Sequence, residues 1–82
     1  MPSVLPPLKG WRVVIYPNDH RPPHVHVIGP EQHARFELLC DLGRVQLMSN
    51  IGFARSELQA IADYLVPHLA HLCLEWERIH GQ

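Results

Sequence analysis

The chain has 82 residues, of which 46% are hydrophobic and 18% charged, with a formal net charge of -1 at pH 7. This length predicts one domain with a small core, because such a chain buries only about 60 to 65% of the surface that its unfolded state exposes. The near-neutral charge argues against a protein held to nucleic acid by a broad basic surface. No apolar run approaches the roughly 20 residues that cross a bilayer, and the N-terminus lacks the basic and apolar regions of a signal peptide, so we expect a cytoplasmic protein without membrane contact.

The numbers of histidines and cysteines limit the chemistry that the chain can carry out. Seven histidines equal the combined number of lysines and arginines, so the net charge becomes positive as the pH falls through about 6.5. The two cysteines, Cys40 and Cys73, each stand where a small apolar residue would also serve. We therefore expect two reduced, buried thiols in a reducing cytosol.

The first half of the chain predicts an extended arm followed by strands. Residues 1–10 hold three prolines and a glycine, which disfavour a helix and predict an N-terminal arm before a single α+β domain at residues 11–82. The polypeptide then alternates between β-rich runs and turn residues such as glycine, proline, asparagine and aspartate. This alternation predicts four strands, at residues 11–16, 24–28, 33–40 and 44–48.

Each predicted strand has one apolar and one polar face, because side chains alternate along a strand. The apolar, inward positions are Trp11, Val13, Ile15, Val25, Val27, Ala34, Phe36, Leu38, Val45 and Leu47. The outward positions are Arg12, Val14, Tyr16, His24, His26, Ile28, His33, Arg35, Glu37, Arg44 and Gln46. If neighbouring strands pair in order, the outward polar groups form one open surface, with the loop at residues 17–23 at its rim.

The second half of the chain has the period of a helix. Apolar residues recur at spacings of three and four, at Leu58, Ile61, Leu65, Leu69, Leu72, Trp76 and Ile79. Ser56 and Gln59 have the form of a capping box, Pro67 predicts a break near residues 63–67, and Gly81 predicts the helix end. The predicted fold is therefore α+β, an antiparallel β-meander of three to four strands with one long C-terminal helix packed on one face.

The densest motif runs from Asp19 to Val27, with the sequence DHRPPHVHV, and it resembles a known family. Together with Tyr16, His68 and the helix end LEWE at residues 74–77, it is similar to the small bacterial and archaeal family called domain of unknown function 4160, over about residues 11–79. The resemblance implies short proteins commonly encoded beside another small protein, in pairs that resemble toxin–antitoxin modules. It implies no activity. The positions that match the family pattern are Asp19, His20, His24, His26, His68 and Trp76.

A metal site is one hypothesis for this motif. His24 and His26 project to the same side of a strand, within reach of one ion. His20 or Asp19 would supply a third ligand from the loop, leaving a position open for water, as in catalytic zinc sites. The candidate cofactor is thus a transition metal such as zinc.

A metal-independent ribonuclease is the second hypothesis. Cleavage of RNA needs a base near neutral pKa, an acid for the leaving oxygen and cations that hold the phosphate. The open face offers His24 or His26 for proton transfer, with further groups from the neighbouring strands. Arg35, Arg12 or Arg44 would bind the phosphate, and Glu37 or Tyr16 is a further candidate.

A module that binds a protein partner is the third hypothesis and the one that the sequence favours. An open sheet face, unprotected edge strands and an apolar N-terminal arm predict pairing, either with a small protein encoded nearby or between copies of the chain. The chain would then be one component of a toxin–antitoxin-like pair, with the histidine motif as its functional surface. Whether it is an enzyme stays undecided.

The remaining histidines and the tryptophans have simpler interpretations. We expect His33, His71 and His80 to be solvated, and His68 to be a helix residue bonded to the sheet or the loop. Trp11 and Trp76 are predicted core aromatics, each large enough to matter in so small a core.

Overall fold

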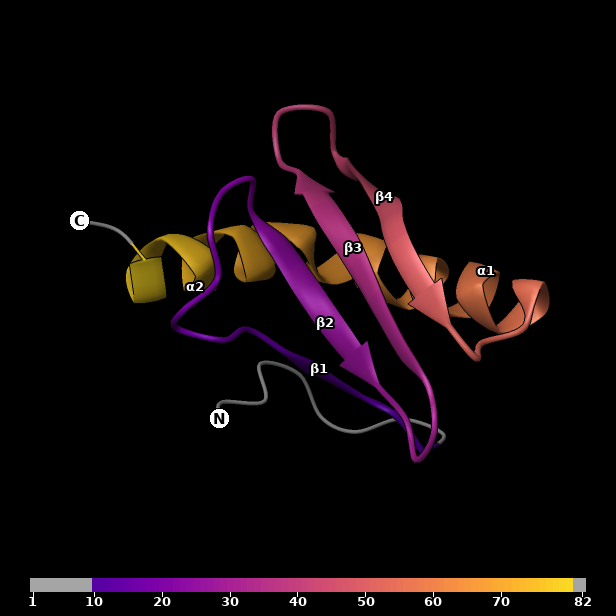
Figure 1. The fold of residues 1–82 in the computed structure, drawn as a ribbon. Helices are drawn as coiled ribbons and strands as arrows, with labels where there is room; N and C mark the ends of the chain where they lie inside the picture. The colour runs from indigo at the N-terminus through magenta and orange to yellow at the C-terminus, as the bar shows by residue number, and fades with distance from the viewer. Residues whose placement is uncertain (1–9, 81–82) are drawn as a thin grey trace.

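Four antiparallel strands form one sheet, and a helical segment lies across one face of it (Figure 1). The computed structural model describes residues 10–80, so nearly all of the predicted N-terminal arm and the predicted helix end at Gly81 lie outside the described residues. The strands follow one another in the sheet in chain order, as the predicted meander requires. They are β1 (Arg12–Val14), β2 (His24–Ile28), β3 (His33–Leu39) and β4 (Arg44–Ile51).

The register of the strands places the predicted outward residues on one face. Across the sheet, His26 lies opposite Val14 on β1 and opposite Arg35 on β3. Next to this row, Glu37 lies opposite His24 on β2 and opposite Gln46 on β4. The predicted polar face therefore exists as one continuous set of side chains.

Strand β4 is longer than predicted, because a bulge at Met48 restores the alternation of its side chains between the two faces of the sheet. Arg35 pairs with Ser49 whereas the next residue, Phe36, pairs with Leu47, so that Met48 has no partner on β3. The extra residue lets the pairing continue to Ile51, where the sequence predicted an end at Met48. Leu47 stays on the apolar face opposite the core residue Phe36.

The helical segment is broken where proline predicts it. It consists of α1 (Arg55–Leu65), the short 3₁₀ turn η1 (Val66–His68) around Pro67, and α2 (Leu69–His80). The predicted capping box at Ser56 is wrong: α1 begins two residues earlier, with Ala54 at the N-cap. The carboxylate of Glu57 accepts the Ala54 N–H at 2.8 Å, and a negative group is favourable in the first turn of a helix.

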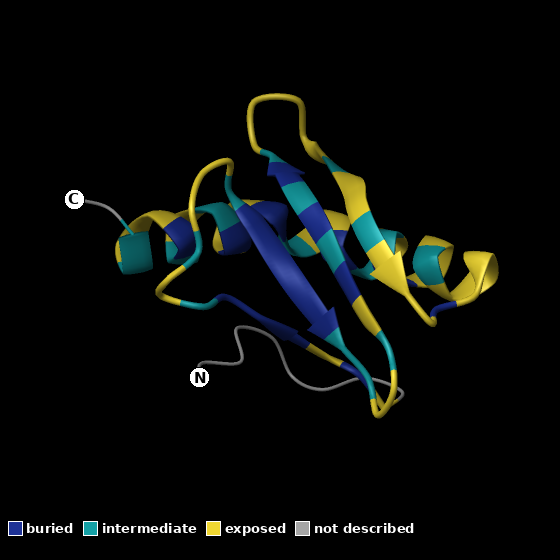
Figure 2. Ribbon diagram, in the orientation of Figure 1, coloured by how far each residue is buried: buried dark blue, intermediate teal, exposed yellow. Residues whose placement is uncertain are grey.

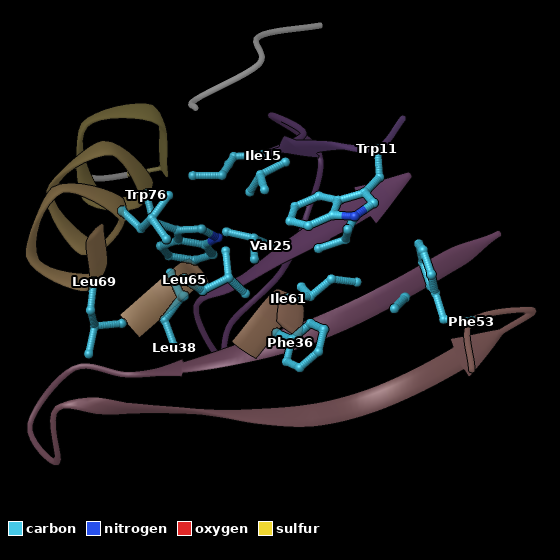
Figure 3. Close-up of a cluster of buried hydrophobic side chains, with 14 residues drawn as sticks. Trp11, Ile15, Val25, Phe36, Leu38, Phe53, Ile61, Leu65, Leu69 and Trp76 are labelled. Carbon is cyan, nitrogen blue, oxygen red and sulfur yellow. The ribbon is translucent and has the colours of Figure 1, made fainter. Parts of the chain in front are cut away.

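The core lies between the sheet and the helices, as Figures 2 and 3 show. It contains the predicted inward strand residues and the predicted helix stripe, among them Val25, Phe36, Ile61, Leu72 and Trp76. Leu47 is the exception, since its side chain faces the helices yet is 42% exposed. Within residues 10–80, no helix combines the length and the apolar character needed to cross a membrane.

A disulfide joins Cys40 to Cys73, so the expectation of two reduced thiols is wrong. Cys40 is exposed in the turn after β3, and Cys73 is half-buried on α2. The turn brings the two Cα atoms to 6.3 Å, a separation that a disulfide bridges without backbone movement. The bond ties the β3–β4 turn to the last helix across 33 residues of sequence.

Reducing this disulfide should lower the free energy of unfolding by about 4 kcal/mol, because the bond restricts an unfolded loop of this length. The measurement is urea denaturation with and without a phosphine reductant. A Cys40→Ala, Cys73→Ala double variant is the control and should not respond to the reductant. An unchanged midpoint for the reduced wild-type protein would contradict the expected contribution.

Candidate metal centre

The loop between β1 and β2 places Asp19 over the outward face of the sheet. The Asp19 N–H donates to the Tyr16 carbonyl at 3.1 Å, and the Tyr16 N–H donates back to Asp19 Oδ2 at 3.4 Å. Aspartate favours such turns because its short side chain bonds nearby backbone groups. The same loop is fastened to α2 by Arg21, which pairs with Glu77 at 3.0 Å and lies 5.1 Å from the centre of the Trp76 ring. Asp19 is therefore held by both local and tertiary contacts.

His24 and His26 are buried, although the outward face was expected to be open. They are 5% and 8% exposed, and the neighbouring Val14 is 1% exposed. The cover comes in part from the loop and the end of β1: Asp19 contacts both histidines, and the Tyr16 ring meets the His26 ring edge-on at 4.7 Å. Figure 2 shows β2 as a buried strand of the sheet. The histidines thus occupy a covered site.

His24 uses one ring nitrogen to bond the backbone. Its Nδ1–H donates to the Pro22 carbonyl at 2.8 Å. A neutral imidazole carries only one N–H, so Nε2 is then a bare lone pair. That lone pair faces Asp19 Oδ2 at 3.4 Å. Two electron-rich atoms therefore face each other in a buried place, unless a cation lies between them.

His26 lies at the centre of a chain of three polar side chains. Its Nε2 is 3.0 Å and 3.2 Å from the two carboxylate oxygens of Asp19, and its Nδ1 is 2.8 Å from His33 Nε2. With the proton of His26 on Nε2, His26 donates to Asp19 and accepts from His33. His33 is exposed, as expected, but its contact with His26 was not predicted. Strand alternation carried the signal for this contact, since His33 pairs with Ile28 and so lies diagonally across from His26.

Burial lowers the pKa of His26 below its ordinary value. The charge of Asp19 and its hydrogen bond raise the pKa and offset this effect only in part, and the nearby His24 and His33 lower it further. The folded protein therefore favours a neutral His26. A neutral imidazole is also the form that binds metal ions.

The free energy of unfolding of chelator-treated protein should fall as the pH drops through about 6.5, because the unfolded chain then takes up a proton that the folded His26 resists. This stability is present above the unfolded pKa and is lost toward the lower, folded value. Urea denaturation at several pH values measures the slope. A His26→Gln variant should show a flatter dependence, and equal slopes for the two proteins would contradict the assignment.

Comparison with protein families gives one match. The family model called Domain of unknown function (DUF4160) matches residues 10–77. The chain belongs to this family. The comparison with curated proteins and the comparison with solved structures gave no match.

The structure brings together only some positions of the DUF4160 pattern. Asp19, His24 and His26 each offer one ligand atom, and these atoms lie within 4.8 Å of one another. His20, the alternative third ligand, is exposed and stands outside this group. His68 is also outside this group and lies on η1, where its ring is 5.1 Å from that of Tyr64.

The groups that were assigned to ribonuclease chemistry lie beside the histidines on the same face. Arg35 is opposite His26 and donates to the Ser49 hydroxyl at 3.0 Å, and Glu37 is opposite His24. Arg12 and Arg44 lie on the two edge strands. These groups and the histidines therefore belong to one surface. Their catalytic roles stay a prediction.

His80 also differs from its prediction, whereas His71 is exposed as expected. The His80 ring stacks on Trp76 at 3.8 Å, and its two nitrogens lie 3.0 Å from the carbonyls of Trp76 and Tyr16. The end of α2 is thereby connected to the start of the loop that carries Asp19. In this DUF4160 domain, Arg21 and His80 thus connect Trp76 to the loop that carries Asp19.

Proposed function

We propose that the domain binds a divalent transition-metal ion through His24 Nε2, His26 Nε2 and Asp19 Oδ2. The observation that carries this proposal is the bare Nε2 of His24, which faces a carboxylate oxygen inside a buried site. A proton on that nitrogen is the alternative occupant. At 3.4 Å the pair is longer than the roughly 2.7–2.9 Å of a charge-assisted hydrogen bond, which favours a larger cation.

Two of the three distances between the ligand atoms suit a tetrahedral ion. Bonds of about 2.0–2.1 Å to nitrogen and oxygen place two ligand atoms about 3.3–3.4 Å apart. The two histidine nitrogens lie 3.4 Å and 3.0 Å from Asp19 Oδ2. Only small shifts would therefore open the space for an ion.

Both histidines also have the outer hydrogen bonds of metal ligands. A ligating histidine usually donates its other N–H to a carbonyl or a similar acceptor, which fixes the tautomer and the ring orientation. Pro22 already provides this acceptor for His24. For His26 the acceptor would be His33 Nε2, which requires the proton of His26 on its Nδ1 and the proton of His33 on its own Nδ1.

Two imidazoles and one carboxylate would leave a position for water or another small ligand. This donor set suits zinc, and with a larger coordination number it suits iron(II). A bound ion of this kind supplies Lewis acidity and lowers the pKa of a bound water. The metal-independent ribonuclease is less well supported, because His24 and His26 are covered and both ring nitrogens of His26 already have hydrogen-bond partners.

The test is a Co²⁺ and Zn²⁺ titration of tag-free, chelator-treated protein. We expect one equivalent of Co²⁺ to bind, with the visible absorption of a four-coordinate site, and Zn²⁺ to displace it. Less than about a tenth of an equivalent, with no uptake at higher metal concentration, would contradict the proposal.

His33→Ala should weaken Zn²⁺ binding by about 10- to 100-fold, because His26 would lose the acceptor for its Nδ1–H. Competition with a chromophoric chelator measures the affinity. His33→Gln, which retains an acceptor, should recover part of the loss, and the exposed His71→Ala is the matched control. An affinity for His33→Ala equal to that of the control would show that His33 has no such role.

Partner binding in a toxin–antitoxin-like pair is a second proposed function. Strand β4 supports it, since this long edge strand exposes Leu47, Met48 and Ile51. Apolar edges of this kind favour pairing with another chain. A cytoplasmic location also stays a proposal, and the Cys40–Cys73 disulfide weighs against it because disulfides are rare in that compartment.

A further inference from the structure

We infer that β4 and α1 form a docking groove for an extended segment of a partner protein, in which acidic residues flank apolar ones. This inference rests on the proposed partner binding and is independent of the metal centre. It names the surface and the chemistry of the segment that would occupy it.

A groove of about 530 Å³ lies between the edge of the sheet and α1. Its apolar lining comes from both layers, with Phe36, Val45 and Leu47 on the sheet and Leu58 and Ala62 on the helix. The polar lining residues are Asn50, Arg55 and Gln59. This volume is in the range of sites that hold small ligands and side chains. An apolar side chain of a bound segment would therefore reach the partly covered Leu47.

The backbone beside this groove is an unoccupied strand edge. Strand β4 has a neighbour on one side only, in the sheet order of the described residues. It is eight residues long, and it contains no proline or lysine, which commonly protect edges. At the other edge, β1 has three residues. An added strand on β4 would pair its backbone with the edge and direct alternate side chains into the groove.

Charge indicates the composition of the segment. Arg44 at the start of β4 and Arg55 at the start of α1 are exposed, and neither forms an ion pair with an acidic group of residues 10–80. Strand β4 contains no acidic residue. A segment with carboxylates at both ends of an apolar stretch would complement these two cations.

The same charges disfavour a second copy as the occupant. An antiparallel pair of β4 strands about a two-fold axis would bring Arg44 of one copy toward the Ile51 end of the other, near its Arg55. Like charges across a strand pair are destabilising. The segment is therefore expected to come from a different protein.

Selection from a phage-displayed library of random peptides, on the whole disulfide-bonded chain, tests this inference. We expect enrichment of sequences that alternate apolar residues and carry Asp or Glu beside them. A synthetic copy of the enriched sequence should bind at least about tenfold more weakly to Leu47→Asp, because this change places a charge in the groove. The control Leu74→Asp on α2, where the side chain is 70% exposed, should bind as the wild type does.

Arg55→Glu gives the sharper readout, because Arg55 lines the groove but is exposed and lies outside the core, so the fold should tolerate the change. Selection on this variant should enrich Lys and Arg in place of Asp and Glu. Peptides that bind but respond to neither variant would overturn the groove and leave partner binding intact. Absence of any enriched peptide would overturn both. A dimer in solution that Leu47→Asp dissociates would show that the occupant is a second copy and would overturn the inference.

Discussion

His24→Ala, His26→Ala and Asp19→Asn should each lower the affinity for Co²⁺ and Zn²⁺ by at least about 100-fold. Each change removes one of three proposed ligands, and this loss should exceed the roughly 10- to 100-fold effect of an outer hydrogen-bond partner. Asp19→Asn keeps the shape of the side chain and removes the charge. The visible Co²⁺ spectrum and competition with a chelator measure the loss.

His20→Ala is the matched control, since His20 belongs to the same motif but is exposed and lies outside the group of ligand atoms. It should bind metal as the wild type does. If His20→Ala lost binding while Asp19→Asn retained it, the third ligand would be the histidine of the loop, and the proposed ligand set would be wrong.

Trp76→Ala should lower the free energy of unfolding by about 3–5 kcal/mol, because it empties the space of the largest fully buried side chain. The free energy of unfolding of native proteins is only about 5–15 kcal/mol, so this loss would be a large fraction of it. The change also removes the ring against which Arg21 and His80 lie, so the loop that carries Asp19 should loosen. Urea denaturation measures the stability, and Zn²⁺ affinity measures the effect on the loop.

Trp76→Phe distinguishes the contribution of ring packing to stability from the cost of the buried indole N–H. This group is buried without an acceptor among residues 10–80, and an unpaired buried donor costs about 1–3 kcal/mol. Replacement by phenylalanine relieves that cost, so it should destabilise far less than alanine does. Leu74→Ala, on the exposed side of the same helix, should change stability by no more than about 0.5 kcal/mol. Equal losses for the alanine and phenylalanine variants at Trp76 would contradict this account.

The sheet and the helix could be predicted from the sequence because their signals are local. Alternation assigned Val25 to the core and His24 and His26 to the opposite face, and a spacing of three and four assigned Ile61 and Trp76 to the helix stripe. Proline at position 67 locates the break because it lacks a backbone donor. Strand ends were predicted less well: β1 spans only Arg12–Val14 within the predicted residues 11–16, and β4 continues to Ile51 past a bulge at Met48 that is set by pairing with β3.

The site could be predicted only in part, because its decisive contacts are tertiary. The motif supplied Asp19, His20, His24 and His26, but the choice of Asp19 over His20 depends on the path of the loop. The covering of the histidines depends on that path too, since Asp19 and Tyr16 fold back over β2. The disulfide joins residues 33 positions apart, and composition alone favoured free thiols.

X-ray absorption spectroscopy of the zinc-loaded, tag-free protein tests the metal centre most directly. The account predicts nitrogen and oxygen ligands at about 2.0–2.1 Å, with scattering from two imidazole rings and no sulfur shell near 2.3 Å. His26→Ala should remove one ring from the spectrum. A sulfur shell, or zinc held by fewer than two imidazoles in the wild-type protein, would contradict a site built from Asp19, His24 and His26.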